Sequence, residues 1–504
     1  MTATVPDDTV AQESPAPRSH QPVTMLRLVL RWAYIAALTV FAFHETLRSL
    51  YQSTVAGSLN GYVWMMPVAA VFAAIGVARR HRTELPIHDR QSDVIVGTLG
   101  LIFALMLQWV LLPRYGQTFH LLRIDLVAMW TFVLSSSIVL FGLRPIIRFG
   151  AVWLLLTMSF PLGYQLSVIA FGGNRPAAGV ASMVIAAVAT AISVGRNVGR
   201  ATTGALAAMA IGLPVLVVMA IFTPDAPLLA FQLIPALTSM AVVGIAMYLL
   251  ARRGRPKRLL DRRIEPVAAT QIMAGVPAVL IVAILISLVD LPRSAANPAW
   301  FDGMKFGRTL AAPAGWHQTG QVDYPWVRRI YGRDATLIRQ RFVADAGNPK
   351  WDKHAHPRTV VVDETSTWRP FSLQVYPTTV LYDETSSRIS DPHFIDLGHG
   401  ITGSLVTVID DKRLLTWNLL TWTWRTQGSA QRVTVAAVDN HEPDALFPEP
   451  SGGLVPTLRT MIIILFRGNS ATWDRDPVFK DADMLTEFSK GLIDAQLTRI
   501  GAHP

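Results

Sequence analysis

Nine long apolar segments fill the first 289 residues of this chain, and they limit its fold more than any other feature. They occupy residues 28–44, 61–78, 94–113, 124–143, 149–171, 177–195, 201–222, 228–250 and 267–289. A helix needs roughly 20 mostly apolar residues to cross a bilayer, and a spanning segment must satisfy its backbone hydrogen bonds internally. We therefore expect a polytopic α-helical membrane bundle of about nine spans at residues 25–289.

Basic residues between these segments predict the orientation of the bundle. Fifteen lysines and arginines lie in one alternating set of loops, at residues 79–93, 143–148, 195–200 and 252–263, against four in the other set. Cytoplasmic loops carry the excess of basic residues. We therefore expect the N-terminus in the cytoplasm and the C-terminal domain outside the inner (plasma) membrane. The polar, proline-containing residues 1–24 indicate a disordered cytoplasmic tail.

The stretch RRGRPKRLLDRR at residues 252–263 carries seven basic residues against one acid, a composition that also suits a nucleic-acid-binding arm. A nucleic-acid-binding protein would be expected to have a basic folded domain. Residues 1–289 carry 22 basic and 11 acidic residues, whereas residues 290–504 carry 23 and 24. Because the second part is near neutral, we expect the stretch to lie against anionic membrane lipids, with no nucleic acid as a partner.

Beyond residue 290 the hydrophobic pattern changes to short β-rich runs separated by turn-forming residues. Strands are expected at residues 358–363, 371–377, 378–383, 403–410, 413–425, 431–439 and 460–466, with a hairpin turn at 410–412 and an amphipathic helix at about 481–500. This pattern predicts an extracytoplasmic α+β domain with an antiparallel sheet at residues 316–504. Residues 290–315 are expected to form a tether between the bundle and this domain.

Three tryptophans of the repeated LLTW motif are candidate residues for binding a ligand or a partner. On a strand, Trp422 and Trp424 share one face and Trp417 takes the other. If the rings are exposed, they could stack on a sugar or lie in the membrane interface. If they are buried, they fill a core, and the sequence leaves both alternatives open.

Other residues that carry chemistry form weak patterns. The repeat DETS, at Asp363–Ser366 and Asp383–Ser386, offers paired acids for acid–base catalysis, but it also suits turns at strand ends. His354 and His356 could bind a metal with a distant carboxylate, although surface histidines in a loop explain them as well. Cysteine is absent, which excludes disulfides and thiolate chemistry. We expect no metal site and no cofactor.

Three runs resemble the exosortase/archaeosortase family: GSLNGYVWMMPVAAVFAAIGVARRHR (57–82), FPLGYQLSVIAFGG (160–173) and ISVGRNVGR (192–200). Members of this family are polytopic proteases or transpeptidases that process sorting signals of exported proteins. Some carry an exosortase-associated C-terminal domain, which LLTWNLLTWTWRT resembles. Asn197 and Arg200 match the Asn-x-x-Arg pattern of the family, and the resemblance implies them as catalytic residues. The catalytic Cys has no counterpart, so the family's acyl-enzyme chemistry is in doubt, and Arg200 also suits a basic cytoplasmic loop.

Three classes of function remain open. The preferred one is a non-catalytic or divergent exosortase-like component of envelope assembly or export, whose domain binds other envelope proteins or glycan intermediates. The second is a Cys-less exosortase-like membrane peptidase. The third is a permease or permease subunit for a lipid-linked or small solute, with residues such as Gln108, Gln165, Gln232 and Gln271 lining a cavity between helices. Because the catalytic Cys is missing, we favour a protein that is not an enzyme.

Overall fold

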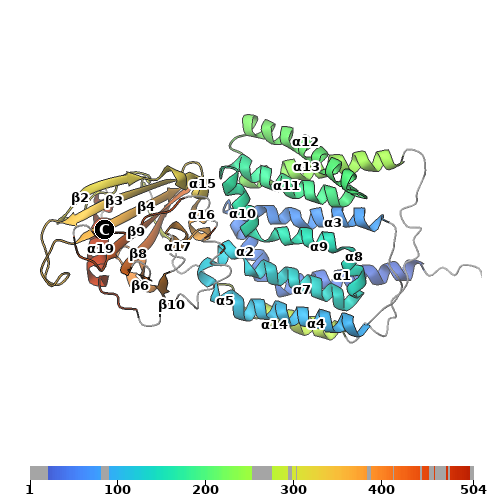
Figure 1. Ribbon diagram of the computed structural model, residues 1–504, viewed down its shortest axis with the longest axis horizontal. Helices are drawn as coiled ribbons and strands as arrows, with labels where there is room; N and C mark the ends of the chain where they lie inside the picture. The colour runs from blue at the N-terminus through green and yellow to red at the C-terminus, as the bar shows by residue number, and fades with distance from the viewer. Residues whose placement is uncertain are drawn as a thin grey trace, which may run out of the picture.

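The structure is a computed structural model that describes residues 21–80, 90–252, 275–292 and 298–499, apart from residues 302, 383–386, 412–413, 443–444, 453–458, 460–461, 463–472 and 475–476. A helix bundle and a sheet domain lie end to end (Figure 1). Most of the tail expected at residues 1–24 lies outside the described residues. Its last four residues already belong to the first helix.

The bundle consists of long apolar helices joined by short ones. They are α1 (Gln21–Ala42), α2 (His44–Val55), α3 (Met66–Ala78), α4 (Arg90–Met106), α5 (Leu112–Arg114), α6 (Phe119–Leu122), α7 (Ile124–Phe141), α8 (Leu143–Arg148), α9 (Gly150–Leu156), α10 (Pro161–Ala170), α11 (Arg175–Val194), α12 (Val198–Phe222), α13 (Leu228–Arg252) and α14 (Gly275–Ser287). The 3₁₀ helix η1 (Leu59–Met65) leads into α3, and the π-helical turn η2 (Leu107–Leu111) continues α4. Outward-facing side chains such as Val217, Ile221 and Leu249 are apolar and exposed, as lipid-facing positions are.

The described residues contain six to eight candidate spans, so the expected count of nine is not confirmed. Within the described residues, six helices are long and apolar enough to cross a membrane: Leu59–Ala78, Gln91–Arg114, Ile124–Phe141, Arg175–Val194, Val198–Phe222 and Leu228–Leu250. The number rises to eight if two bent helix pairs, Leu26–Ala42 with His44–Val55 and Gly150–Ser159 with Pro161–Ala170, each form one span. The ninth expected segment contains α14, which has 13 residues, and residues 267–274 lie outside the described residues. A polytopic helical bundle is confirmed, and a count of nine is not.

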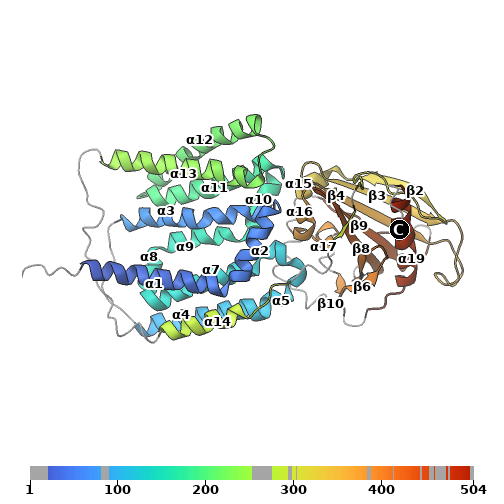
Figure 2. The same ribbon diagram turned by 180° about the vertical axis from the view of Figure 1, so that it is seen from behind.

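The two bends place short helices across one end of the bundle. Pro161 begins α10, and Phe160 before it is extended, with φ −73° and ψ 120°, as is usual for a residue that precedes proline. This pair is bent by 66° and the pair of α1 and α2 by 72°. In both views, α2 and α10 lie at the end of the bundle that faces the sheet domain (Figures 1 and 2).

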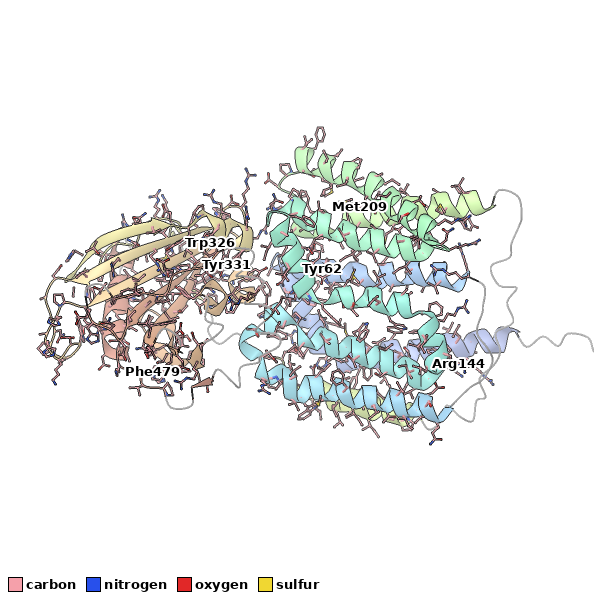
Figure 3. The ribbon with its side chains drawn as sticks, viewed as in Figure 1. Tyr62, Arg144, Met209, Trp326, Tyr331 and Phe479 are labelled. Carbon is pink, nitrogen blue, oxygen red and sulfur yellow. The ribbon has the colours of Figure 1, made fainter. Side chains whose placement is uncertain are left out.

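Basic residues gather at the other end of the bundle. Helix α8, which carries Arg144 and Arg148, lies at the end away from the sheet domain (Figure 3). The turn between α11 and α12, which carries Arg196, lies at that end as well, and Arg200 follows it in the first turn of α12. The sheet domain and these basic loops are therefore at opposite ends of the bundle.

The sheet domain is built on one sheet, in which ten strands lie within the described residues. They are β1 (Ala299–Trp300), β2 (Trp316–Asp323), β3 (Thr336–Ala344), β4 (Thr359–Thr367), β5 (Arg388–Ser390), β6 (His393–Asp396), β7 (Thr402–Asp410), β8 (Leu415–Thr426), β9 (Ser429–Val438) and β10 (Trp473–Asp474). The order is β10-β5-β7-β8-β9-β4-β3-β2, with β6 paired to β7 and β1 to β8. Only the short β1 and β10 pair in parallel. The expected antiparallel sheet is thereby confirmed.

Helices cover both faces of this sheet. One face packs against α19 (Ala482–Arg499), and the other packs against η6 (Pro325–Val327), α15 (Arg328–Tyr331), α16 (Pro370–Val375) and α17 (Thr378–Leu381). Side chains alternate between the two cores along each strand. Trp422 and Trp424 share a core with Phe488 of α19, whereas Trp417 shares the other core with Tyr376.

Some expectations for this domain are wrong. The strands expected at residues 371–377 and 378–383 are not found in the described part of these segments, most of which forms α16 and α17. Pro370 and Pro377 stand at the beginnings of these helices, where the missing N–H of proline is tolerated. The strand expected at residues 460–466 lies almost entirely outside the described residues. The expected tether is also too long: from Ala299 it belongs to the sheet domain, since β1 pairs with β8 and Leu310 is part of the core.

Candidate functional site

Helix α10 contacts the sheet domain and the interior of the bundle at the same time. Leu162, Leu166 and Ile169 lie three or four residues apart and pack into the core beneath α15 and α16. Tyr164 and Gln165 of the same helix reach into the bundle, where both are buried. The helix therefore connects the interior of the bundle to the sheet domain.

Tyr164 and Gln165 belong to a cluster of six polar side chains, which we call the polar cluster. It draws on η1, α10, α11 and α13, and its members are Asn60, Tyr62, Tyr164, Gln165, Ser182 and Gln232. Each of these residues is at most 5% exposed. Tyr62 lies in the half of the bundle nearer the sheet domain (Figure 3). The polar cluster is thus enclosed at the end of the bundle that the sheet domain covers.

Hydrogen bonds around Tyr164 join the helices of the polar cluster. Its hydroxyl donates to the carbonyl oxygen of Ala178 at 2.8 Å and lies 3.0 Å from Ser182 Oγ. Gln232 Nε2 donates to the same hydroxyl at 3.1 Å and to the carbonyl oxygen of Leu59 at 2.7 Å. One phenol and one amide therefore connect α10, α11, α13 and η1.

The polar cluster is incompletely paired. The rings of Tyr62 and Tyr164 stack with their centroids 3.8 Å apart, and Gln165 Nε2 reaches Asn60 Oδ1 at 3.4 Å. Among the described residues, however, no partner exists for the Tyr62 hydroxyl, Asn60 Nδ2, Gln165 Oε1 or Gln232 Oε1. Leaving one buried polar atom unpaired costs about 1–3 kcal/mol. Four such atoms in one cluster indicate a place that binds water or a ligand group.

The polar cluster contains no charged side chain, and the buried ion pair of Arg123 and Asp125 lies outside it. None of its six members carries a carboxylate, a guanidinium or an imidazole. The ion pair of Arg123 and Asp125, 2.8 Å apart and fully buried, anchors α2 to the start of α7, since Arg123 also donates to Thr46 and Ser49. Because the polar cluster offers nothing to neutralise a buried charge, it suits an uncharged group.

The sheet domain rests directly on this end of the bundle. A Cβ added to Gly173, whose φ is +73°, would lie 2.1 Å from the carbonyl oxygen of Arg329 in α15. Arg369 donates to the Gly173 carbonyl oxygen at 3.4 Å. The rings of His120 and Phe371 meet edge to face at 5.0 Å. Burial and a neighbouring arginine lower the pKa of His120 to about 4, so at neutral pH this contact is uncharged.

Asn197 and Arg200 lie away from the polar cluster. Asn197 caps α12, because its Oδ1 accepts a hydrogen bond from the Arg200 backbone N–H at 2.9 Å. Both residues are exposed, and the start of α12, where they lie, is at the end of the bundle opposite the sheet domain (Figure 1). The Asn-x-x-Arg pattern therefore has a local explanation as a helix cap, and the structure does not bring it next to the other candidate residues.

Trp417, Trp422 and Trp424 are buried and at most 2% exposed. The rings of Trp422 and Trp424 meet edge to face with centroids 5.9 Å apart, and the Trp424 indole N–H donates to Gln431. Stacking on a sugar requires an exposed ring face, which none of the three has here. Of the two alternatives for these residues, the structure corresponds to the core.

The first DETS repeat is part of β4, not a turn, and its two acids point to opposite faces of the sheet. Asp363 accepts two hydrogen bonds from Arg339, at 2.7 and 2.6 Å. Glu364 accepts the Gly307 N–H at 3.1 Å and a bond from Gln431, and burial raises its pKa to about 8. The second repeat lies outside the described residues. The side chain of Glu364 is fully buried, which indicates a structural role.

The histidine pair lies in a loop. The carboxylate of Asp352 accepts hydrogen bonds from the backbone N–H groups of His354 and His356, at 2.7 and 3.1 Å. These backbone hydrogen bonds stabilise the conformation of the loop. In the part of the chain that the structure describes, no group of three or more histidines, aspartates or glutamates could hold a metal ion.

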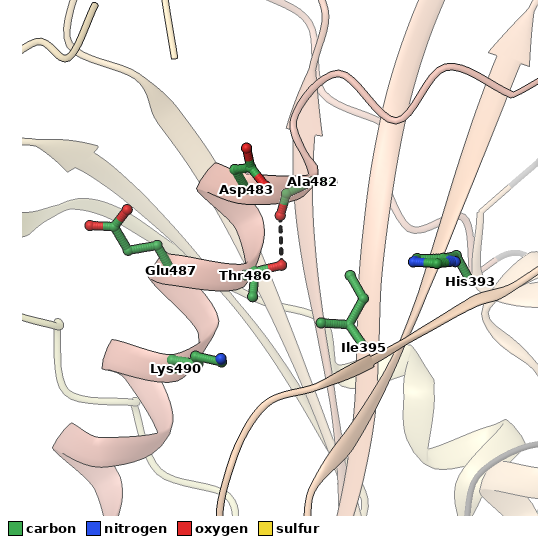
Figure 4. Close-up of a pocket in the computed structure, with 7 residues that line it drawn as sticks. All are labelled: His393, Ile395, Ala482, Asp483, Thr486, Glu487 and Lys490. Carbon is green, nitrogen blue, oxygen red and sulfur yellow. Dashed lines mark hydrogen bonds between the residues drawn. The ribbon is translucent and has the colours of Figure 1, made fainter. Parts of the chain in front are cut away.

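An open groove of about 490 Å³ lies between β6 and α19 (Figure 4). It is lined by His393, Ile395, Ala482, Asp483, Thr486, Glu487 and Lys490. Thr486 Oγ1 donates to the carbonyl oxygen of Ala482, one turn earlier in α19. The lining mixes two acids with a lysine and a histidine and does not select one ligand chemistry, so no function is assigned to the groove.

Of the polar cluster, the sequence predicts Gln165 and Gln232 as cavity-lining residues but not the other four members. Gln108 lies on η2, which contributes nothing to the polar cluster, and the fourth glutamine of that set is outside the described residues. One feature of the sequence does indicate the polar cluster: Asn60 and Tyr164 place polar groups in or beside apolar segments. Polar residues within a membrane are usually paired or functional.

Comparisons with known proteins provide no relative. No family model matches the chain, and neither a curated protein nor a solved structure does.

Proposed function

We propose that this chain is a multi-pass protein of the bacterial inner membrane, and a non-catalytic, exosortase-like component of envelope assembly or export. The observation that carries the proposal is the contact between α10 and the core beneath α15 and α16. Because this contact fixes the sheet domain on the bundle, the outer surface of the domain faces exported proteins or glycan intermediates in one orientation. Such a fixed orientation is what a binding platform requires.

A binding role is favoured over a Cys-less peptidase by the positions of the candidate residues. Asn197 and Arg200 are exposed at the end of the bundle away from the sheet domain. Neither contacts the polar cluster, and the chain has no thiol to serve as the family's nucleophile. A peptidase would need a nucleophile and a base within hydrogen-bond reach of each other.

The orientation we propose has the N-terminus in the cytoplasm and the sheet domain outside. The basic residues at the end away from the sheet domain support it. Because the chain lacks cysteine, single-cysteine variants report one position each. In intact spheroplasts, an impermeant maleimide should label Thr319→Cys on β2 but not Arg196→Cys, and lysis should expose both. Labelling of Arg196→Cys before lysis would overturn the orientation.

Crosslinking in native membranes tests the function itself. Cysteine at Thr319 or at Trp368, both exposed on the sheet domain, should crosslink to an exported protein or to an enzyme that processes envelope glycans. Arg196→Cys is the matched control at the opposite end. Crosslinks to a transporter subunit would contradict the assembly proposal and favour the alternative below, and crosslinks from Arg196→Cys alone would contradict both.

A permease is the second candidate, and the buried Gln165 and Gln232 favour it. Transport by alternating access requires that a central site open to each side in turn. In a permease, cysteine in place of Ser182 should therefore react with an impermeant thiol reagent added outside and with one trapped inside vesicles. Reaction from one side only, or from neither, would exclude this candidate.

A further inference from the structure

The unpaired atoms of the polar cluster form a defined set of donors and acceptors. Gln232 Nε2 is fixed by the carbonyl oxygen of Leu59, so the free Gln232 Oε1 is an acceptor. Asn60 and Gln165 share one hydrogen bond, and either orientation of these two amides leaves one donor and one acceptor free. The Tyr62 hydroxyl can donate or accept.

We propose that the polar cluster binds an amide group. The carbonyl oxygen of an amide accepts the free N–H of the Asn60–Gln165 pair, and its own N–H donates to Gln232 Oε1. Tyr62 supplies a further hydrogen bond to the carbonyl oxygen. A carboxylate lacks the donor and an ammonium lacks the acceptor, and the polar cluster has no charge to compensate either.

The site is closed in this structure, and α10 closes it. Tyr164 and Gln165 both come from this helix, so a movement of α10 opens the polar cluster to a ligand. The same movement shifts Leu166 and Ile169, which pack into the core of the sheet domain. Binding of the amide is therefore coupled to how the sheet domain is seated on the bundle.

The amide has two chemical sources, which small probes distinguish. Acetamide represents a primary amide, as in a glutamine side chain, and N-methylacetamide represents a secondary amide, as in a peptide bond. N,N-dimethylacetamide is the matched control, because it keeps the carbonyl and lacks the N–H. The full-length protein, purified in detergent, is heated with increasing concentrations of each probe. We expect a saturable rise of Tm with acetamide, N-methylacetamide or both, and none with N,N-dimethylacetamide.

Two variants assign the effect to the polar cluster. Tyr62→Phe removes only a hydroxyl without a partner, so the protein should fold at least as stably as the original while binding the probe several-fold more weakly. Gln232→Met removes the acceptor and should abolish the saturable rise. Gln52→Met, at an exposed position of α2, is the control and should leave the saturable rise of Tm unchanged.

Three results would overturn the proposal: no saturable rise with either N–H-bearing probe, an equal rise with N,N-dimethylacetamide, or full binding by both Tyr62→Phe and Gln232→Met. Each would mean that the polar cluster does not recognise an amide N–H. The proposal uses the polar cluster of the permease candidate but does not require transport. Amide binding is measured on purified protein and access on Ser182→Cys in vesicles, so failure of one is distinguishable from failure of the other.

Discussion

Glu364 couples the folding of the sheet domain to pH. Burial raises its pKa from 4.5 to about 8, whereas in the unfolded chain the carboxyl titrates near its usual value. Between these two values the folded protein holds a proton that the unfolded chain has lost. The free energy of unfolding therefore falls as pH rises, by about 1.4 kcal/mol per pH unit across this window.

Replacing Glu364 with glutamine should remove this contribution. Glutamine has the shape of the protonated acid, and its Oε1 still accepts from Gly307 and Gln431. We expect Glu364→Gln to have little effect on thermal unfolding near pH 5 and to raise Tm above that of the original protein at pH 8. The measurement is Tm between pH 5 and 8 for the two proteins. If the Tm values of the two proteins change with pH in parallel, Glu364 does not titrate in this range.

Trp422 is a test of the core assignment. Its side chain is 1% exposed among Trp424 and the residues of α19, and truncating a buried tryptophan to alanine costs about 3–5 kcal/mol. Trp368→Ala is the control, because Trp368 is 68% exposed and its loss should change stability by less than about 0.5 kcal/mol. Loss of ligand or partner binding in Trp422→Ala with unchanged stability would contradict the assignment.

At the scale of elements, hydropathy predicts a helix bundle and periodicity predicts four of the ten described strands, but not the long strands β2 and β3. Strands were expected at 358–363, 403–410, 413–425 and 431–439, and β4, β7, β8 and β9 lie there. The helix expected at 481–500 is α19. These segments follow their patterns because each buries a regular set of side chains. The failures at residues 371–383 have a local cause, since apolar β-rich runs after a proline are equally compatible with short helices.

The polar cluster could not be predicted in full, for a different reason. Asn60, Tyr164 and Gln232 are separated by about a hundred and seventy residues of chain between the first and the last, and hydropathy carries no information on which helices are neighbours. Each residue by itself is compatible with a span end or a lipid interface. Only the packing of η1, α10 and α13 brings them together.

The Asn-x-x-Arg pattern is an element-scale feature in this chain, because it caps α12. Asn197→Ala removes the cap and should lower the free energy of unfolding by about 1 kcal/mol, whereas Asn197→Asp keeps an acceptor and should lower it much less. The measurement is denaturant unfolding of the purified protein in mixed micelles. If instead both variants abolish processing of an exported substrate without changing stability, the residue has the catalytic role that the family resemblance implies.

At the scale of the whole molecule, the bundle and the sheet domain meet through an apolar contact rather than a long free tether. Leu166 and Ile169 of α10 share a core with Tyr331 and Tyr376 of the sheet domain. Apolar contacts are not weakened by salt. The contact also depends on Gly173, where any side chain would collide with the backbone of α15.

Cutting the chain between the two parts should therefore not separate them. A protease site inserted between Pro292 and Pro298 and cleaved in isolated membranes should leave the sheet domain bound, even in high salt. Gly173→Ala in the same background should release it after cleavage, because the added Cβ would lie 2.1 Å from the Arg329 carbonyl oxygen. Gly163→Ala, on α10 with open space around the added atom, is the control and should retain the domain. Release of the domain from the unsubstituted protein by cleavage alone would show that the covalent connection, rather than α10, holds it at the membrane.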